Sequence, residues 1–250
     1  MIKKFKNYPI YNNIYPRFKT RSGCPIISNY KAESITKKED CLDYNDTLQI
    51  TSYYFKKITN EIPVFINVGA GFSGRVENEI MSLFPKAKII NIEPQIEQIK
   101  KLEQNVSNIR DSIIIENAAL VNDNYSSNTI ELYGTGESAS ILKLGKKNKI
   151  VIKAIKLKDI IEKYHIKNID VLFINAEGIE IDLLNNICNN IKYSNIINQI
   201  SVNYHTHVRE FNISSKIVRE SKRKLLKYYK LCESRIHIMP KPYPVVLFFK

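Results

Sequence analysis

The amino-acid sequence predicts an α/β fold: a doubly wound, mostly parallel sheet of seven strands with an antiparallel C-terminal strand hairpin, preceded by an N-terminal extension. Three observations support this prediction. From residue 63 onward, short apolar segments alternate with amphipathic helical segments, which is typical of parallel strands joined by crossover helices. The first strand runs directly into a glycine-rich turn. The last two segments are strand-like and are joined through prolines, so the sheet is expected to end in a hairpin.

The chain divides into two parts at about residue 60. Residues 1–60 form the extension; they are rich in Tyr and Lys, and prolines interrupt any long element there. Within them, residues 46–59 begin with a cap-like Asp-Thr pair and continue with apolar residues at helical spacing, so one helix is expected. Residues 61–250 form the α/β domain. A chain of 250 residues suits one such domain, whereas two full domains would be cramped.

The elements of the domain follow from the spacing of apolar residues. Strands are expected at 64–68, 87–92, 113–115, 170–174, 196–202, 235–238 and 245–249. Helices are expected at 77–84, 96–106, 158–164, 181–191 and 214–229. Residues 121–150 interrupt this alternation with turn-forming residues. They predict an inserted hairpin of two strands, 129–133 and 140–144, followed by a half-exposed strand at 150–157.

The composition is strongly basic, with a formal net charge of +13 at pH 7. Because Lys and Arg gain affinity for phosphates by releasing counterions, this charge admits a polyanionic partner. The chain is, however, rich in Lys, Asn and Ile throughout, a pattern that biased codon use produces without any partner. One basic cluster falls within a single predicted helix, where a solvated face explains it equally well: Lys216, Arg219, Lys222, Arg223, Lys224, Lys227 and Lys230. Specific nucleic-acid binding is therefore not expected.

The cysteines and the hydropathy pattern exclude several classes of protein. The four cysteines lie far apart and form no CxxC pair, so neither a metal site nor a redox motif is expected. No apolar run approaches the roughly 18 residues of a membrane span, and the N-terminus has no signal-peptide pattern. A cytoplasmic location follows as the expectation.

The most informative segment joins the first strand of the domain to its first helix. Gly69, Gly71 and Gly74 give the pattern GxGxxG, with Ala70 inside it, so backbone amides and a helix N-terminus can approach a nucleotide-like ligand. Glu93 follows about 20 residues later at the end of the second strand, where a carboxylate can accept both ribose hydroxyls. This Rossmann-like pair fits either a dinucleotide or S-adenosylmethionine, since both present an adenosine ribose.

Asn67 helps to separate these two cofactors. Dinucleotide-binding loops normally keep an apolar residue two positions before the first glycine. Methyltransferases place a polar, usually acidic, group there to reach the methionine end of the cofactor. Since an unpaired polar group in a buried strand costs roughly 1–3 kcal/mol, Asn67 is expected to face the cofactor. The alternative is an Asn that is satisfied locally at a strand end.

A second polar signature follows the predicted strand 170–174. The sequence Asn175-Ala176-Glu177-Gly178-Ile179-Glu180 places polar side chains around a glycine, at the carboxyl edge of the sheet. Ligands of open α/β sheets bind at that edge. Because the first and fourth strands are neighbours in this topology, Asn67 and Asn175 are both expected to face the cofactor across the crevice.

These motifs together resemble the FkbM-type methyltransferase family, over about residues 60–205. The similar segments are Phe65 to Gly74, Ile92-Glu93-Pro94, Asn117-Ala118-Ala119-Leu120, Glu137-Ser138-Ala139-Ser140, Asp159 in a tLDdl-like stretch, Asn175 to Glu180 as the family's DxEGxE, and Gln199 to His205. The resemblance implies a class I methyltransferase fold with S-adenosylmethionine as cofactor. The residues expected to bind it are Asn67, Gly69, Ala70, Gly71, Glu93, Pro94, Asn117, Ala118 and Asn175.

The resemblance also implies the reaction: methyl transfer to an oxygen, commonly a hydroxyl of a sugar, lipid or natural product. Such transfer is an in-line displacement, accelerated by alignment of the acceptor and by a base that removes the hydroxyl proton. Glu177 and His205 are the candidate catalytic residues, and an unperturbed imidazole pKa near 6.5 suits that role. His165, His207 and His237 have no motif around them. The expected partner is a small-molecule or glycan acceptor.

Three positions depart from the family pattern. Asn67 and Asn175 stand where the family usually has Asp, and Asn203 stands where it has Glu. Asn keeps the shape and the hydrogen-bonding ability but drops the negative charge. A cofactor-binding or scaffold protein that has lost catalysis is therefore one alternative. A flavin or nicotinamide oxidoreductase is a second, without a second nucleotide-binding segment to support it. A nucleic-acid methyltransferase, without an NPPY-type loop, is a third.

Overall fold

The computed structural model describes residues 41–45, 50–54, 57–136, 139–143, 148–206, 208–236 and 244–250. Most of the predicted N-terminal extension lies outside these ranges, as do Glu137 and Ser138 of the family-like motif, His207 and His237. None of the described helices is long and apolar enough to cross a bilayer.

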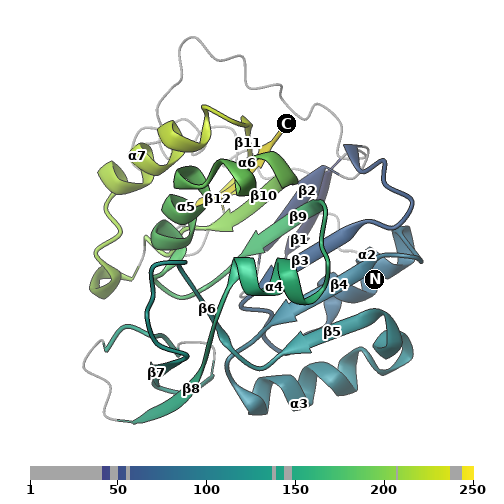
Figure 1. The fold of residues 1–250 in the computed structure, drawn as a ribbon, viewed down its shortest axis with the longest axis horizontal. Coiled ribbons are helices and arrows are strands. Elements are labelled where there is room, and N and C mark those ends of the chain that lie inside the picture. Colours follow the sequence, from purple (N-terminus) through teal and green to yellow (C-terminus); the bar gives the residue numbers. More distant parts are fainter. Residues whose placement is uncertain are drawn as a thin grey trace, which may run out of the picture.

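A seven-stranded sheet forms the centre of the molecule, as predicted, in the order β11-β12-β10-β9-β3-β4-β5 (Figure 1). Five strands are parallel: β3 (Val64–Val68), β4 (Lys88–Ile92), β5 (Ile113–Glu116), β9 (Ile169–Ile174) and β10 (Ile197–Asn203). The closing pair, β11 (Lys230–Ile236) and β12 (Pro244–Phe249), is antiparallel, and β12 inserts between β10 and β11. The predicted neighbours β3 and β9 pair directly.

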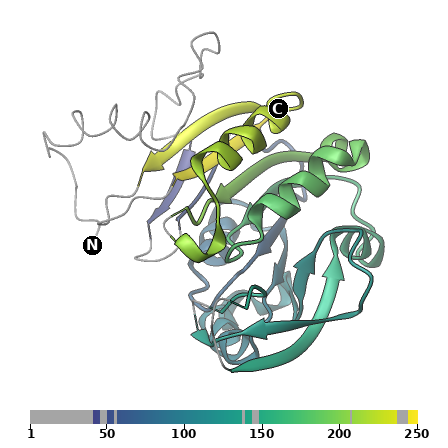
Figure 2. The ribbon, with the colours of Figure 1, turned by 90° about the vertical axis from the view of Figure 1, so that its left-hand side faces the viewer.

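Helices cover both faces of this sheet. On one face lie α2 (Arg75–Leu83) and α3 (Ile96–Asn105), and on the other lie α4 (Leu157–Lys163), α5 (Glu180–Asn189), α6 (Ile191–Ile196) and α7 (Ser215–Leu225) (Figures 1 and 2). Successive residues of a strand alternate between the faces. Phe65 accordingly belongs to the core under α2 and α3, whereas Ile66 and Val68 belong to the core under α4 to α7. The odd-numbered residues of β3 therefore face α2.

The helix predicted at residues 46–59 is wrong. The chain there forms strand β2 (Ile50–Tyr54), paired antiparallel with β1 (Cys41–Asn45), and β2 lies against β10 and β12. Tyr53 is fully buried and meets the rings of Phe65 and Phe173 edge-on, with centroids 5.7 and 5.8 Å apart. Aromatic and β-branched residues fit a pleated strand, and this tertiary burial outweighs the helical spacing that the local sequence suggested.

The insertion also pairs differently from the predicted hairpin. Strand β7 (Thr129–Tyr133) pairs antiparallel with β8 (Lys149–Lys156), and β8 pairs parallel with β6 (Ala119–Val121), so a separate three-stranded sheet forms. Within residues 139–143 the predicted second strand is reduced to one bridge, between Ser140 and Tyr133. The hydroxyl of Ser140 donates to the carbonyl of Glu177 at 2.7 Å, which ties this segment to the β9–α5 loop.

The two C-terminal boundaries shift as well. Helix α7 ends at Leu225, four residues before the predicted end at 229, and β11 begins at Lys230, where 235 was predicted. The order of elements is unaffected.

Candidate functional site

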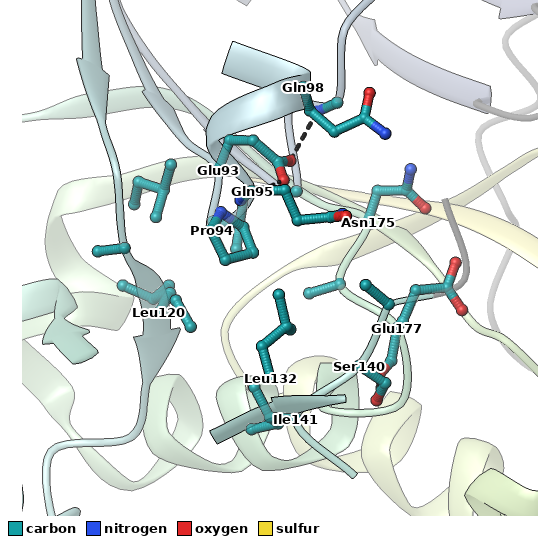
Figure 3. Close-up of a pocket in the computed structure, with 18 of the residues that line it drawn as sticks. Glu93, Pro94, Gln95, Gln98, Leu120, Leu132, Ser140, Ile141, Asn175 and Glu177 are labelled. Carbon is teal, nitrogen blue, oxygen red and sulfur yellow. Dashed lines mark hydrogen bonds between the residues drawn. The ribbon is translucent and has the colours of Figure 1, made fainter. Parts of the chain in front are cut away.

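A pocket opens at the carboxyl ends of β3, β4 and β9, bounded on one side by the three-stranded insertion (Figure 3). Seven of the eleven residues predicted for the site line it: Gly69, Gly71, Glu93, Pro94, Ala118, Asn175 and Glu177. Asn67, Ala70, Asn117 and His205 are not among its lining residues. Residues from several of the predicted motifs therefore lie at one cavity: seven line it, and the other four lie outside its lining.

The turn after β3 requires glycine at its first position. Gly69 has φ +74°, and a Cβ there would lie 2.1 Å from the carbonyl oxygen of Asn175. Its amide donates to the carbonyl of Ile92 at 2.9 Å, while the amide of Asn175 donates to the carbonyl of Val68, also at 2.9 Å. The backbones that follow β3, β4 and β9 are thereby drawn together, and this contact forms the floor of the pocket.

Glu93 is the acidic residue at the end of β4, and its side chain is held in place. Only 4% exposed, it accepts hydrogen bonds from the amide of Gly71 at 2.9 Å and the amide of Gln95 at 3.0 Å, one on each carboxylate oxygen. Burial raises the pKa of the Glu93 carboxyl, and the two amide bonds oppose this rise. Because each oxygen carries two lone pairs, the carboxylate retains the capacity to accept further donors from the pocket.

Asn117 supports Glu93 from outside the pocket. Its amide nitrogen donates to the carbonyl of Glu93 at 3.1 Å and to that of Pro94 at 2.9 Å. The side chain predicted to bind a cofactor thus fixes the backbone of the acidic turn, and its neighbour Ala118 lines the pocket in its place.

Asn67 faces α2, as the alternation along β3 requires. Its side chain is 4% exposed, and Nδ2 donates to Oε1 of Glu77 at 3.0 Å. Glu77 is itself buried, and that burial raises the pKa of its carboxyl, against the opposing effect of its hydrogen bonds. Asn67 therefore has the local partner that was considered as the alternative, and its contact with a cofactor stays a prediction.

Asn175 lies on the pocket wall and pairs with the third departure from the family pattern. Nδ2 of Asn203, at the end of β10, donates to Oδ1 of Asn175 at 2.9 Å. Two neutral amides can bond to each other directly, whereas two carboxylates at this separation would repel. The Asn at position 203 is thus a hydrogen-bonding partner for the Asn at position 175.

Glu177 and His205 meet at the rim of the site. Oε1 of Glu177 lies 3.1 Å from Nε2 of His205, and Nδ1 of the same ring contacts Glu180. Burial alone lowers the pKa of the imidazole, but its hydrogen bonds and charge interactions with Glu177 and Glu180 outweigh burial and raise the pKa to about 10. The ring therefore has a carboxylate beside each nitrogen, and its pKa lies above the ordinary value near 6.5.

Two glutamines at the start of α3 complete the wall, and the sequence motifs did not single them out. Gln95 reaches across to the insertion, where its Nε2 donates to the carbonyl of Gly136 at 2.8 Å. Gln98 lines the pocket and is 7% exposed, and its Oε1 has no hydrogen-bond partner among the described residues. Their position within five residues of Glu93 is the signal that would have identified them.

The pocket wall combines polar acceptors with apolar surface. Glu93 has free acceptor capacity, Gln98 offers an unpaired buried carbonyl, and Pro94 and Ala118 give apolar surface beside them. Such a mixture of apolar walls with a few oriented polar groups is typical of cofactor pockets.

Comparison with a solved structure shows the same fold. Methyltransferase FkbM from Methylobacillus flagellatus KT superimposes with a TM-score of 0.52 at 14% sequence identity, over 79% of this chain and 46% of that chain. The present chain thus spans less than half the length of that protein. The N-terminal domain of human METTL16 in complex with SAH matches with a TM-score of 0.47 at 11% identity, over 78% of this chain and 65% of that one. A search of curated proteins gave no significant match.

A family model identifies the chain more directly. The model of the methyltransferase FkbM domain matches residues 67–222, from the end of β3 into α7. The matched segment is more than half of the 250 residues and contains the glycine turn, Glu93, Asn175 and His205. The chain therefore belongs to the FkbM methyltransferase domain family.

Proposed function

We propose that this protein transfers the methyl group of S-adenosylmethionine to a hydroxyl oxygen of a sugar, glycan or other small metabolite. Membership of the methyltransferase family supports the class of reaction. The observation that carries the proposal is the placement of two carboxylates on one pocket: Glu93 beside the glycine turn, and Glu177 on the wall formed by the β9–α5 loop (Figure 3). Glu93 suits the hydroxyls of a ribose, and Glu177 suits the hydroxyl of an acceptor.

Glu93 and its neighbours would hold the cofactor. The carboxylate accepts the two ribose hydroxyls, the apolar surface of Pro94 and Ala118 packs on the adenine, and Gln98 supplies an acceptor for an amino or hydroxyl donor. When bound, the cofactor supplies a methyl group on a positively charged sulfur. Gly69 and Asn175 border the part of the pocket next to Glu177, so they lie on the side where the methyl group would meet its acceptor.

Glu177 is the group proposed to take the hydroxyl proton. Its side chain is 25% exposed and lines the pocket, whereas His205 already carries protons on both ring nitrogens at neutral pH and has no free lone pair to accept another. Of the two candidate residues, Glu177 is therefore the better base. As the hydroxyl oxygen bonds to the methyl carbon, its proton passes to Glu177, and the carbon–sulfur bond breaks.

Transfer from S-adenosylmethionine labelled on the methyl group tests this proposal. Monosaccharides, oligosaccharides and small hydroxylated metabolites are offered as acceptors, and products are assayed for label that survives mild alkali, which distinguishes an ether from an ester. Glu177→Gln is expected to lower kcat by about 100-fold or more and to leave the affinity for S-adenosylhomocysteine unchanged. Glu162→Gln, an exposed change on α4, serves as the control. Label found only on nitrogen, or full activity in Glu177→Gln, would contradict the proposal.

A further inference from the structure

The imidazole of His205 lies between two carboxylates in the interior of the protein. Nε2 is 3.1 Å from Oε1 of Glu177, and Nδ1 contacts Oε1 of Glu180. The histidine side chain is 5% exposed and that of Glu180 is fully buried. The ring meets Phe211 edge-on, with 6.2 Å between centroids and an interplanar angle of 87°.

This arrangement determines the protonation state of the ring by geometry. A neutral imidazole donates from one nitrogen and carries a lone pair on the other. In that state one of the two nitrogens would direct its lone pair at a carboxylate oxygen. When both glutamates are ionised, only the imidazolium, which donates from both nitrogens, satisfies both contacts.

We propose that Glu180 is a positioning residue: it holds His205 as a permanent imidazolium, and this cation fixes the carboxylate of Glu177 on the pocket wall. The role given to Glu177 rests on the proposed function. The state of His205 does not, because it follows from contacts that the described chain makes on its own.

Glu180 is bound to His205 in two ways. The same carboxylate oxygen that contacts Nδ1 also accepts the backbone amide of His205 at 3.1 Å. Because Glu180 begins α5 and His205 follows β10, these bonds join the start of the helix to the end of the strand. A carboxylate that bonds both the ring and the backbone of one residue leaves that ring little freedom to rotate.

The loop that carries Glu177 is also tightly packed. Gly178 has φ +90°, and a Cβ there would lie 2.8 Å from Cδ1 of Leu142 and 2.8 Å from Cδ1 of Phe211. The carbonyl of Glu177 accepts the hydroxyl of Ser140 at 2.7 Å. The backbone of Glu177 is thus held from the insertion side, and its carboxylate is held from the His205 side.

Among the described contacts of His205, two carboxylates from different elements raise the pKa of its imidazole. Glu177 belongs to the β9–α5 loop and Glu180 to α5, and together they outweigh the effect of burial on that pKa. Removing one carboxylate weakens this opposition to the burial effect, which lowers the pKa. The pKa of His205 is then expected to fall from about 10 into the range of about 5 to 8, in which histidine normally titrates.

Histidine side-chain ¹⁵N NMR of the full chain, without cofactor or acceptor, tests the proposal. The chain has four histidines, and His205→Gln identifies the signal of interest. In the wild type, both ring nitrogens of His205 are expected to stay protonated from pH 6 to about 9. Glu180→Gln, which keeps the size of the side chain, is expected to give a ring that loses a proton between about pH 5 and 8. Circular dichroism and thermal unfolding establish that the variant folds.

Two further variants sharpen the test. Asp182→Asn removes the same charge from the same helix, but Asp182 bonds Asn122 and not His205, so the histidine signal is expected to match the wild type. Glu177→Gln removes the second carboxylate from the other nitrogen and is also expected to lower the pKa of His205. It supplies the answer if Glu180→Gln does not fold.

The outcomes separate this inference from the proposed function. A wild-type His205 that titrates near neutral pH would overturn the inference, as would a titration unchanged by loss of either carboxylate. Calorimetry with S-adenosylhomocysteine is run in parallel. Failure of that ligand to bind, with His205 protonated at pH 8, would contradict the proposed function and leave the positioning role of Glu180 intact.

Discussion

The amide of Asn67 donates a hydrogen bond to the carboxylate of Glu77, with 3.0 Å between Nδ2 and Oε1, in the buried layer between β3 and α2. A donor at position 67 is what a buried carboxylate on α2 requires, because an unpaired charge in the interior is strongly destabilising. An amide donor at position 67 therefore suits the buried carboxyl at position 77 better than a second carboxyl would.

Asn67→Asp is expected to destabilise the protein without tightening cofactor binding. Two buried carboxyls would face each other at about hydrogen-bond distance, so the pKa of at least one would be raised above its unfolded value. A carboxyl whose pKa is higher in the folded protein than in the unfolded chain favours the unfolded chain once the pH exceeds the unfolded pKa. The free energy of unfolding should therefore fall by about 1–3 kcal/mol at pH 8 and by less at pH 5, as measured by urea denaturation at both values.

Asn175→Asp is the matched comparison, since it adds the same charge on the pocket wall, away from Glu77. It is expected to favour the cationic S-adenosylmethionine over S-adenosylhomocysteine, because only the former carries the sulfonium charge. A variant Asn67→Asp that is as stable as wild type at pH 8 and also binds S-adenosylmethionine more tightly would show that position 67 acts on the cofactor.

Glu93→Ala is expected to weaken the binding of S-adenosylhomocysteine by tenfold or more. Charge-assisted hydrogen bonds contribute roughly 1.5–3 kcal/mol each, and Glu93 is proposed to make two of them to the ribose. Glu93→Gln keeps the size and should weaken binding less. Glu97→Ala, an exposed change on the helix α3 that follows Glu93, with a side chain 74% accessible, is the control. Unchanged affinity in Glu93→Ala, measured by calorimetry, would remove the ribose assignment.

Gly69→Ala is expected to abolish detectable binding of S-adenosylhomocysteine and to lower the melting temperature. The new Cβ would lie 2.1 Å from the carbonyl of Asn175, so the loops after β3 and β9 must separate. Gly136→Ala is a control for the backbone alone, since Gly136 also has positive φ but no atom within 4 Å of an added Cβ. Equal effects of the two changes on binding and melting temperature would mean that strain, and not the close approach, is what matters at Gly69.

Binding to RNA or DNA is expected to be weak, indifferent to sequence and steeply reduced by salt. The exposed basic residues of α7 can contact phosphates, and such contacts give affinity without sequence information. Fluorescence anisotropy with two unrelated oligonucleotides across a salt series measures this. Tight binding that discriminates between the sequences at physiological salt would contradict it.

The order of strands along the chain, and the position of the pocket at the carboxyl edge of the sheet, could be predicted because they depend on local patterns. Apolar segments of five residues or so, a glycine turn and an acidic residue at the next strand end are all readable along the chain. The direction of Asn67 was also readable in principle: along a strand it shares the side of Phe65, away from Val68. The family pattern of acidic residues at this position led to the opposite expectation.

The remaining features depend on contacts between distant residues. The segment around Tyr53 has helical spacing but forms a strand, because Tyr53 packs on Phe65 and Phe173, which lie 12 and 120 positions further along the chain. The protonation of His205 depends on Glu180, which is 25 positions away and belongs to another element. Neither burial nor a charged partner of this kind is encoded in the neighbouring sequence, so residue type alone gave the wrong pKa.

Calorimetric titration of the protein with S-adenosylmethionine, S-adenosylhomocysteine and NAD tests the cofactor assignment most directly. The pocket beside Glu93 is expected to bind the first two with one molecule per chain. NAD is expected to show no heat of binding at the same concentrations, because the chain belongs to a methyltransferase family. Saturable binding of NAD, with no binding of S-adenosylhomocysteine, would contradict the assignment of this pocket to a methyl donor.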